Sequence, residues 1–286
     1  MVLCVLTLYA CAQKKQGGFS ADSAAVVDAM WQTDSLDGMV LKRMHFDQKN
    51  CFGANQYVAV LEIAPESPCR LAFTYEPQRT RTTEHARRHG AVAAVNGSFF
   101  DMGKHFPICY LRIDGVEVGE NTPQASDSLH RKYYQYGSLK LHGGRPEIFI
   151  PDSARMAERQ LPDSNIMTAG PLLIYHGEDV PQRVDKSFVS DRHNRTAIGV
   201  KSDGTVLLVV VDGRTRQSEG MSLPDFVRLL RSLGCYDALN LDGGGSTTMF
   251  VDGFGHNGIV NHPTDNGKYD HEGERTVSNC IVVLHP

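Results

Sequence analysis

Residues 240–248, with the sequence NLDGGGSTT, combine a carboxylate, a bare backbone and hydroxyl groups at the end of an apolar run. Glycines let the backbone adopt positive φ and approach a ligand closely, and consecutive N–H groups in such a loop can bind an anion. A tight turn is the alternative, since Asp-Gly is common in hairpins, but the hydroxyl groups favour a ligand site. The residues assigned to it are Asp242 as a catalytic group, and Gly243, Gly244, Gly245, Ser246 and Thr247 as substrate-binding groups.

A second carboxylate, Asp212, has the same local setting as Asp242. It ends an apolar run and directly precedes a glycine, Gly213, which is assigned to substrate binding. If the two strands are parallel and adjacent, both carboxylates lie at one edge of a sheet. Such a pair could supply the base or nucleophile for hydrolysis at a sugar carbon, with stereochemistry left open because the sequence does not give their separation. For Asp212, capping of a turn is the alternative.

Two arginines, Arg195 and Arg275, each stand directly before a strand-like run. A guanidinium group can hold a phosphate through two parallel hydrogen bonds, so both are candidate phosphate ligands, and Arg195 is assigned to the catalytic set. The alternative is an ordinary solvated or surface-paired arginine. Asp265 and the nearby histidines His193 and His262 lie in polar loops, where they could bind substrate, bind a metal or transfer protons.

Three further residues are assigned to substrate binding. Asn96 and Gly97 follow the apolar run at 91–95 and could offer an amide and an open backbone to sugar hydroxyls or phosphate; an Asn-Gly turn is the alternative. Gly170 precedes Pro171 inside the apolar run 166–175, where it could shape the wall of a cleft or simply bend the chain.

The sequence contains none of the usual metal-binding patterns, such as HExxH or an EF-hand loop. No dedicated metal site is therefore predicted, although Ca²⁺ or Mg²⁺ held loosely by Asp242 and a substrate phosphate remains open. The five cysteines beyond residue 20 are odd in number and lack CxxC spacing, so neither a zinc site nor a disulfide framework follows.

The elements that must position these groups can be read from the apolar patterns. Residues 195–200 and 206–211 predict a hairpin that turns at 202–204. Residues 222–233 predict a helix with an apolar stripe, and 236–241 predict the buried strand that carries Asp242. The elements predicted elsewhere are helices at 21–32 and 79–90, a helical stretch at 152–161, early strands at 39–46, 57–64 and 69–76, short strands over 108–150, and a last strand at 276–285.

These elements favour an α/β (α+β) fold, with one domain over residues 21–286 and a mixed β-sheet flanked by helices. The 286 residues are 41% hydrophobic and 22% charged, which is typical of a globular chain. The formal net charge of -4, with Lys and Arg scattered along the chain, argues against a nucleic-acid partner.

The N-terminus differs from the rest of the chain. Residues 2–10 are apolar but too few to span a bilayer, and the sequence Leu-Tyr-Ala-Cys at 8–11 resembles a bacterial lipobox. This predicts a signal peptide and tether over residues 1–20, lipidation at Cys11, and an exported protein attached to the bacterial envelope through its lipid. A core strand is the alternative interpretation, which the polar spacer after Cys11 disfavours.

Four segments in order resemble the phosphodiester glycosidase family: NGSFF, RTAIG, VDGR followed by GMSL, and NLDGGGSTT, at 96–100, 195–199, 211–223 and 240–248. The resemblance extends to His262–Asp265 and Arg275–Ser278. It covers roughly residues 55–286, with the motif core at about 90–286, and the ordered set is far more specific than any single motif.

The resemblance implies a hydrolase that cleaves the glycosidic bond of sugar-1-phosphodiesters. The leaving group would be a phosphate monoester, whose second pKa near ~6 makes strong acid catalysis less necessary. A carboxylate, cations and N–H donors would then suffice. Two alternatives remain open: a metal-assisted phosphodiesterase that cleaves P–O, and a surface lipoprotein that binds glycans without turnover.

Overall fold

The computed structural model describes residues 20–123, 131–182 and 186–286. Cys11 and nearly all of the predicted signal peptide and tether lie outside the described residues, so lipidation stays a prediction. Within those three ranges, no helix is both long and apolar enough to cross a membrane.

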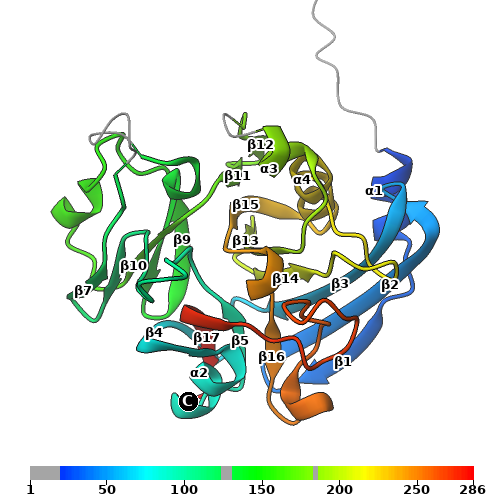
Figure 1. The fold of residues 1–286 in the computed structure, drawn as a ribbon, viewed down its shortest axis with the longest axis horizontal. Helices are drawn as coiled ribbons and strands as arrows, with labels where there is room; N and C mark the ends of the chain where they lie inside the picture. Colours follow the sequence, from blue (N-terminus) through cyan, green and yellow to red (C-terminus); the bar gives the residue numbers. More distant parts are fainter. Residues whose placement is uncertain (1–19, 124–130, 183–185) are drawn as a thin grey trace, which may run out of the picture.

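The largest sheet has eight strands in the order β1-β2-β3-β14-β13-β15-β11-β12 (Figure 1). The N-terminal meander β1–β3 forms one side, and the predicted hairpin β13–β14 lies at the centre. The strand bounds are β1 Gln32–Leu36, β2 Met39–Cys51, β3 Ala54–Ile63, β11 Leu172–Tyr175, β12 Glu178–Asp179, β13 Arg195–Lys201, β14 Val206–Val211 and β15 Cys235–Asn240.

Two smaller sheets complete the domain. The five-stranded sheet has the order β7-β6-β10-β8-β9, and the four-stranded sheet has the order β16-β5-β17-β4. Their strands are β4 Arg70–Arg81, β5 Ala93–Asn96, β6 Leu111–Ile113, β7 Val116–Gly119, β8 Gly137–His142, β9 Arg145–Phe149, β10 Ile166–Ala169, β16 Met249–Val251 and β17 Thr276–Leu284.

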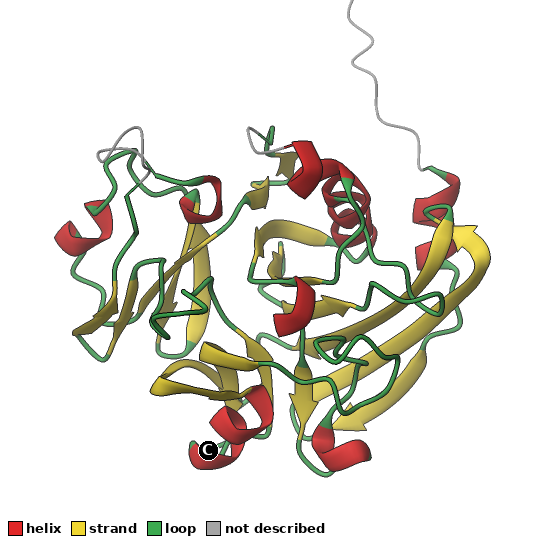
Figure 2. Cartoon of the chain, in the orientation of Figure 1, coloured by secondary structure: helices red, strands yellow, loops and turns green. Residues whose placement is uncertain are grey.

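The helices are short and lie outside the sheets (Figure 2). The α-helices are α1 Ala21–Val27, α2 Thr82–Arg88, α3 Lys186–Ser190 and α4 Leu223–Ser232, and the 3₁₀ turns are Tyr133–Gln135, Ala157–Gln160, Gly244–Ser246 and His256–Gly258. The start of α4 is fixed as its sequence predicts. The Ser222 hydroxyl accepts a hydrogen bond from the Asp225 amide at 3.3 Å, and Pro224 occupies the first turn.

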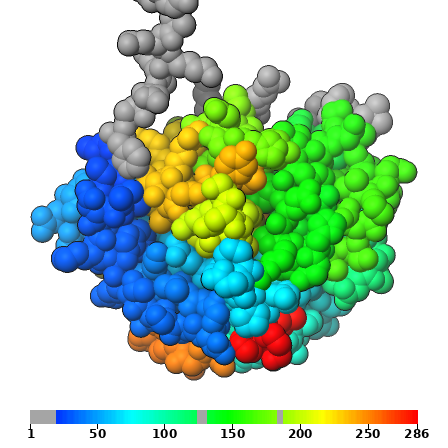
Figure 3. Space-filling model, turned by 180° about the vertical axis from the view of Figure 1, so that it is seen from behind, coloured from blue at the N-terminus to red at the C-terminus, as the bar shows by residue number. Residues whose placement is uncertain are grey.

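Strand β14 shows why the central sheet is stable. Val206, Leu208 and Val210 enter the core shared with the two smaller sheets, while the alternate residues face the helical layer of α1 and α4. Because both faces of the strand are covered, its sequence is a continuous apolar run with no polar alternation. Seen from behind, the blue N-terminal strands and the green five-stranded lobe lie on opposite sides of the later segments (Figure 3).

The α+β class and the single domain are confirmed, but the expected single mixed sheet is wrong. The described strands form three sheets, and each of their ladders is antiparallel. One reason lies in the apolar run 166–175. It divides at the cis Gly170–Pro171 bond into β10, in the five-stranded sheet, and β11, in the eight-stranded sheet. Hydrophobicity alone could not reveal a change of sheet within an uninterrupted apolar run.

The strand ends bring the candidate residues to one edge of the central sheet. Strands β14 and β15 are both antiparallel to β13, so they run parallel to each other with β13 between them. Asp212 and Asp242 therefore follow strands that end at the same edge, although the strands are not adjacent as expected. Strand β13 begins at that edge, and its first residue is Arg195.

Candidate active site

The glycine loop, residues 243–246, is held in place by the end of β5. The Asp242 amide donates to the Gly97 carbonyl at 3.0 Å, and the Asn96 side-chain amide donates to the Asp242 carbonyl at 2.6 Å. The Asn96 oxygen in turn accepts from the Thr196 hydroxyl at 2.9 Å. Asn96 is fully buried, and both its side-chain nitrogen and its side-chain oxygen form hydrogen bonds within the protein. In this structure, Asn96 and Gly97 position the loop instead of facing a ligand.

The tips of charged side chains pack directly against the glycines of the loop. Gly244 has φ +61°, and a Cβ placed there would lie 2.7 Å from Nη2 of Arg214. A Cβ on Gly245 would overlap both the Arg275 guanidinium and the Asp265 carboxylate. A side chain at either position would therefore displace the tip of an arginine or of Asp265.

Arg275 and Asp265 form an ion pair across the loop. Nε of Arg275 donates to the Asp265 carboxylate at 2.8 Å, and Nη2 contacts the same oxygen. Nη1 lies 3.5 Å from the hydroxyl of Ser246, which is fully buried. The structure therefore brings together the predicted residues Asp242, Ser246, Asp265 and Arg275.

The Asp242 carboxylate has a perturbed acidity. Its Oδ1 accepts a 2.9 Å hydrogen bond from the Gly243 amide. Burial raises the pKa of Asp242 to about 6, against the opposing effects of a hydrogen bond from Ser246 and the charges of Arg275 and Arg214. Desolvation favours the neutral form of a carboxyl group, whereas nearby cations favour the ionised form. A buried carboxyl group whose pKa lies close to neutral pH, with cations beside it, is typical of a catalytic group.

Arg214 is the site residue that sequence reasoning missed. It belongs to the VDGR segment, directly after Asp212 and Gly213, and it takes φ +65°, which is uncommon for a residue other than glycine. Its exposed side chain makes neither a hydrogen bond nor an ion pair within the described part of the chain. Its place two residues after a candidate carboxylate was the available signal, but only the tertiary structure shows its guanidinium over Gly244.

Asp212 lies at the same edge but is enclosed. Its carboxylate is 0% exposed and accepts from the Asn261 side chain at 2.7 Å, and from the His262 amide and ring Nδ1 at 2.8 and 2.9 Å. The Asn261 side chain also donates to the Thr247 carbonyl at 3.1 Å. Asp212 therefore ties the 261–275 segment to the glycine loop, and its carboxylate has no free surface for direct substrate contact.

His262 begins a stack of aromatic rings on the far side of Asp212. Its ring lies 3.8 Å from that of Tyr269 and 4.4 Å from that of His271, centroid to centroid. His271 stacks in turn on His256 at 3.9 Å. Burial lowers the pKa of His271, and the neighbouring histidines add to this effect. His193, the other histidine singled out in the sequence, bonds through its backbone to Met221 and does not join the stack.

Arg195 is directed away from the glycine loop. Its guanidinium, 2% exposed, donates to the carbonyls of Met221 at 3.0 Å and Phe188 at 2.9 Å, and it packs over the Phe188 ring. The adjacent Thr196 contacts the loop from the opposite face of the strand, because successive side chains alternate. Arg195 connects β13 to the α3 region, and the cations beside the glycine loop are Arg275 and Arg214.

Two predicted glycines serve close packing. Gly213 approaches the Asn194 amide, and the Gly243 backbone approaches the Asn194 carbonyl, so both tighten the contact between strand ends. The Thr247 hydroxyl is also buried and lies 3.2 Å from the Thr196 hydroxyl. These residues shape the site from beneath instead of lining its surface.

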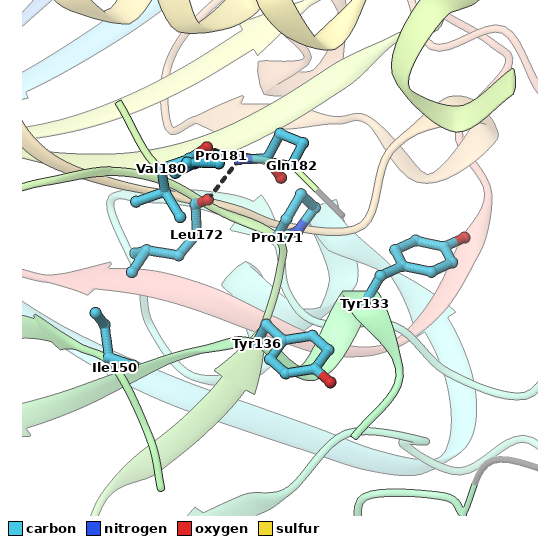
Figure 4. A pocket seen from close by; sticks show the side chains of 8 residues that line it. All are labelled: Tyr133, Tyr136, Ile150, Pro171, Leu172, Val180, Pro181 and Gln182. Atoms are coloured by element: carbon cyan, nitrogen blue, oxygen red, sulfur yellow. Dashed lines mark hydrogen bonds between the residues drawn. The ribbon is translucent and has the colours of Figure 1, made fainter. Parts of the chain in front are cut away.

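Gly170 precedes Pro171, which lines a largely apolar pocket of about 270 Å³ (Figure 4). The Gly170 carbonyl accepts from the Asn240 side chain at 2.9 Å, and a Cβ on Gly170 would meet the Tyr133 carbonyl. The pocket is lined by Tyr133, Tyr136, Ile150, Pro171, Leu172, Val180, Pro181 and Gln182. No carboxylate, histidine, lysine or arginine lines this pocket, so the chemistry is assigned to the glycine loop.

A row of half-buried aromatic rings connects this pocket with the loop region. Tyr133 lies 5.1 Å from Tyr134, and Tyr134 lies 5.1 Å from Phe99, centroid to centroid. Cys109, which donates to the Tyr134 carbonyl at 3.3 Å, is close enough for the charge of Asp242 to raise its thiol pKa further. Partly exposed rings of this kind are suited to contact the apolar face of a sugar.

The described residues contain no group of three His, Cys, Asp or Glu side chains arranged to hold a metal ion. Near Asp242, positive charge comes from Arg275 and Arg214, and Asp265 is already paired. This donor set does not fit Ca²⁺ or Mg²⁺, which require several oxygen ligands. No step of the chemistry below depends on a metal.

We expect Gly245→Ala to lower kcat/KM by about 10- to 100-fold, the loss typical of one or two charge-assisted hydrogen bonds. The added methyl group must displace Arg275 or Asp265. Steady-state kinetics and a melting curve would measure the effect. Gly255→Ala is the matched control, since nothing lies within 4 Å of that Cβ. Equal kinetics for the two variants would contradict this reading of the loop.

The fold and site define an α+β domain with an aspartate and a glycine loop held between two arginines. Comparison with known proteins identifies the family to which this domain belongs. Residues 89–284 match the family model described as phosphodiester glycosidase. The chain therefore belongs to the phosphodiester glycosidase family.

Individual relatives agree with this assignment. The chain is 35% identical over 249 residues to the N-acetylglucosamine-1-phosphodiester alpha-N-acetylglucosaminidase of Bos taurus, covering 79% of this chain and 44% of that protein. It is 33% identical over 210 residues to the uncharacterized SPbeta prophage-derived protein YomE of Bacillus subtilis, covering 70% of this chain and 29% of that protein. The chain thus spans less than half the length of either relative.

A solved structure supports the fold. The catalytic domain of the zebrafish N-acetylglucosamine-1-phosphodiester alpha-N-acetylglucosaminidase, auto-inhibited by its pro-peptide, is similar with a TM-score of 0.67. The similarity covers 90% of this chain and 89% of that one at 18% sequence identity. At this identity the likeness establishes the architecture alone.

Proposed function

We propose that this protein is a hydrolase that cleaves the bond between the anomeric carbon and the phosphate of sugar-1-phosphodiesters. The observation that carries the proposal is the Asp242 carboxylate, with its pKa raised to about 6, beside a glycine loop flanked by Arg275 and Arg214. The family membership supports the same reaction class.

In the proposed reaction, the two arginines hold the scissile phosphate beside the glycine loop, and Asp242 acts on the sugar side. The departing phosphate monoester is stable as an anion at neutral pH, so it needs little protonation. Above about pH 6 Asp242 is ionised. It can then act at the oxocarbenium-like centre, either as the nucleophile or as the base that activates a water molecule.

The enclosed Asp212 is proposed to act as a positioning residue. It holds Asn261 and His262, and Asn261 holds the Thr247 carbonyl at the end of the glycine loop. Arg195 supports the site in the same indirect way, through its hydrogen bonds to backbone carbonyls. Direct contact with the substrate is assigned to Asp242, Arg275 and Arg214, and the buried Ser246 hydroxyl supports the Asp242 carboxylate.

Hydrolysis in ¹⁸O-labelled water tests the bond that is cleaved. The substrates are N-acetylglucosamine-1-phosphodiesters and a panel of other sugar-1-phosphodiesters. Cleavage at carbon leaves the released phosphate unlabelled, whereas cleavage at phosphorus labels it. We expect unlabelled phosphate; labelled phosphate would identify a phosphodiesterase instead, and glycan binding without turnover of any diester would favour a binding protein.

The raised pKa of Asp242 predicts opposite pH effects on activity and stability. Catalysis by the ionised group makes kcat/KM rise with pH and level off above about 6. The folded protein binds the Asp242 proton more tightly than the unfolded chain does, where the pKa is about 3.9. Asp242 therefore lowers the relative stability of the folded state as pH rises from about 4 to about 6.

Kinetics and melting temperatures between pH 4 and 8 would check both effects. The difference in melting temperature between wild type and Asp242→Asn should become less favourable to wild type across the window from about 4 to about 6. A melting-temperature difference that does not change with pH would contradict the assignment of this pKa to Asp242. So would a kcat/KM that already levels off well below pH 5.

We further propose that the protein is exported and attached to the bacterial envelope by a lipid on Cys11. The support is the apolar segment at residues 2–10 and the polar spacer that follows Cys11. Expression of wild type and Cys11→Ala in a bacterial host, followed by membrane fractionation, tests it. Wild type should be found with the membrane and the variant should not; identical fractionation would contradict the anchor.

A further inference from the structure

A basic cavity opens beside the glycine loop. Its lining is polar and charged, in contrast to the aromatic row. Its volume is about 600 Å³, and it is lined by Lys49, Asn55, Arg214, Thr215, Arg216 and Glu219. Arg214 belongs both to this lining and to the candidate active site, where its guanidinium approaches Gly244. The cavity therefore shares one arginine with the place assigned to the scissile phosphate.

The cavity carries unneutralised positive charge. Glu219 is the one carboxylate in its lining, and it already lies 3.5 Å from the Lys49 ammonium. Arg214 and Arg216 are exposed and have no ion pair among the residues whose placement is described. By contrast, Arg275 is paired with Asp265, and Arg195 is buried against carbonyls. These two arginines thus line the same cavity without a neutralising partner among the described residues.

The backbone that carries these arginines is fixed. The buried Ser218 hydroxyl donates to the Asp212 carbonyl at 2.8 Å and accepts from the Tyr57 amide at 2.9 Å. The Asn55 side chain donates to the Arg216 carbonyl at 2.9 Å, and the Glu219 amide donates to the Asn55 carbonyl at 2.8 Å. Cations on a preordered backbone bind an anion with less loss of conformational entropy than cations on a free loop.

We propose that this cavity is a subsite for a second phosphate group on the leaving-group side of the substrate. One phosphate lies at the glycine loop in the function proposed above, on which this inference rests, and the next lies between Arg214, Arg216 and Lys49. Guanidinium groups match phosphate oxygens in geometry and charge. A phosphate monoester carries about -1.5 to -2 charges at neutral pH. It therefore suits a site with several cations better than a ligand carboxylate, with its single charge, would. The substrate class is therefore a sugar-1-phosphodiester whose alcohol part bears a further phosphate.

Two matched substrates test this subsite: the ethyl phosphodiester of N-acetylglucosamine, and the same diester with a phosphate on the second carbon of the ethyl group. We expect wild type to favour the second by about tenfold in kcat/KM, as for one added charge-assisted contact. Arg216→Gln should reduce this ratio to about one. The charge-matched control is Arg88→Gln on α2, outside the cavity, which should keep the ratio at about ten. A wild-type ratio of one, or an unchanged ratio in Arg216→Gln, would overturn the proposal.

Binding of the two leaving groups separates this inference from the hydrolysis itself. Calorimetry with ethyl phosphate and with ethane-1,2-diol bisphosphate needs no turnover. Wild type should bind the bisphosphate about tenfold more tightly, and Arg216→Gln should remove the difference. If neither diester is cleaved but the binding difference is present and lost in the variant, the subsite stands and the proposed function fails. Equal binding of the two ligands by wild type would refute the subsite.

Discussion

Asp242→Asn is expected to lower kcat by at least about a thousandfold while leaving the protein folded. The asparagine keeps the shape of the side chain and can still accept the Gly243 hydrogen bond, but it cannot become a nucleophile or a base. Because burial makes the wild-type carboxylate costly to ionise, the variant should be at least as stable as wild type at pH 7. Single-turnover kinetics and thermal unfolding would measure the two effects.

Asp203→Asn provides the control for this loss. Asp203 lies in the turn between β13 and β14, at the other end of the same hairpin from the site. Its carboxylate accepts a 2.8 Å hydrogen bond from the Thr205 amide, which an asparagine oxygen can also accept. Full activity in this variant would tie the loss to position 242. An Asp242→Asn enzyme with more than a tenth of wild-type activity would remove Asp242 from the reaction.

Arg131→Met is expected to give the largest loss of stability, about 3–5 kcal/mol in the free energy of unfolding. Arg131 and Glu158 form a fully buried ion pair with two contacts of 2.8 Å, and Glu158 also accepts from Ser138 and Thr168 at 2.9 and 2.8 Å. Without its arginine, the buried carboxylate loses its compensating charge. Urea unfolding at pH 7 would measure the loss.

Arg159→Met is the matched comparison, because Arg159 pairs with Glu117 and Glu120 at the surface of the same lobe. Exposed pairs are worth at most about 1 kcal/mol, so this variant should lie close to wild type. Similar losses for both variants would show that burial does not set the strength of the Arg131 pair. The pair also has a functional setting, since Arg131 lies two residues before the 3₁₀ turn Tyr133–Gln135, whose backbone packs on Gly170.

Much of the local structure could be predicted from the sequence because its causes are local. The β13–β14 hairpin is encoded by two apolar runs and a turn, and α4 is encoded by its Ser222 cap, Pro224 and an apolar stripe. The edge shared by Asp212 and Asp242 also followed, since each carboxylate lies within two residues of a strand end. The helix predicted at 152–161 is reduced to a 3₁₀ turn, Ala157–Gln160, where tertiary contacts of Glu158 dominate.

The roles of individual side chains could not be predicted in the same way. In a strand, neighbouring residues face opposite sides, so one position separates Thr196, which contacts the loop, from Arg195, which is directed to the α3 region. The partners that enclose Asp212 come from about fifty residues later in the chain, as the Asn261 and His262 contacts show. No pattern near Asp212 could reveal them.

The sequence by itself determined the family motifs, the central hairpin, α4 and the carboxylate at the glycine loop, because these depend on short-range periodicity and on residue types that few other structures tolerate. The tertiary structure decided which charged groups are free to act. Packing between distant segments buried Arg195 and Asp212 among their partners. It left Asp242 beside Arg275 and Arg214, where desolvation and opposite charge together set the acidity of the site.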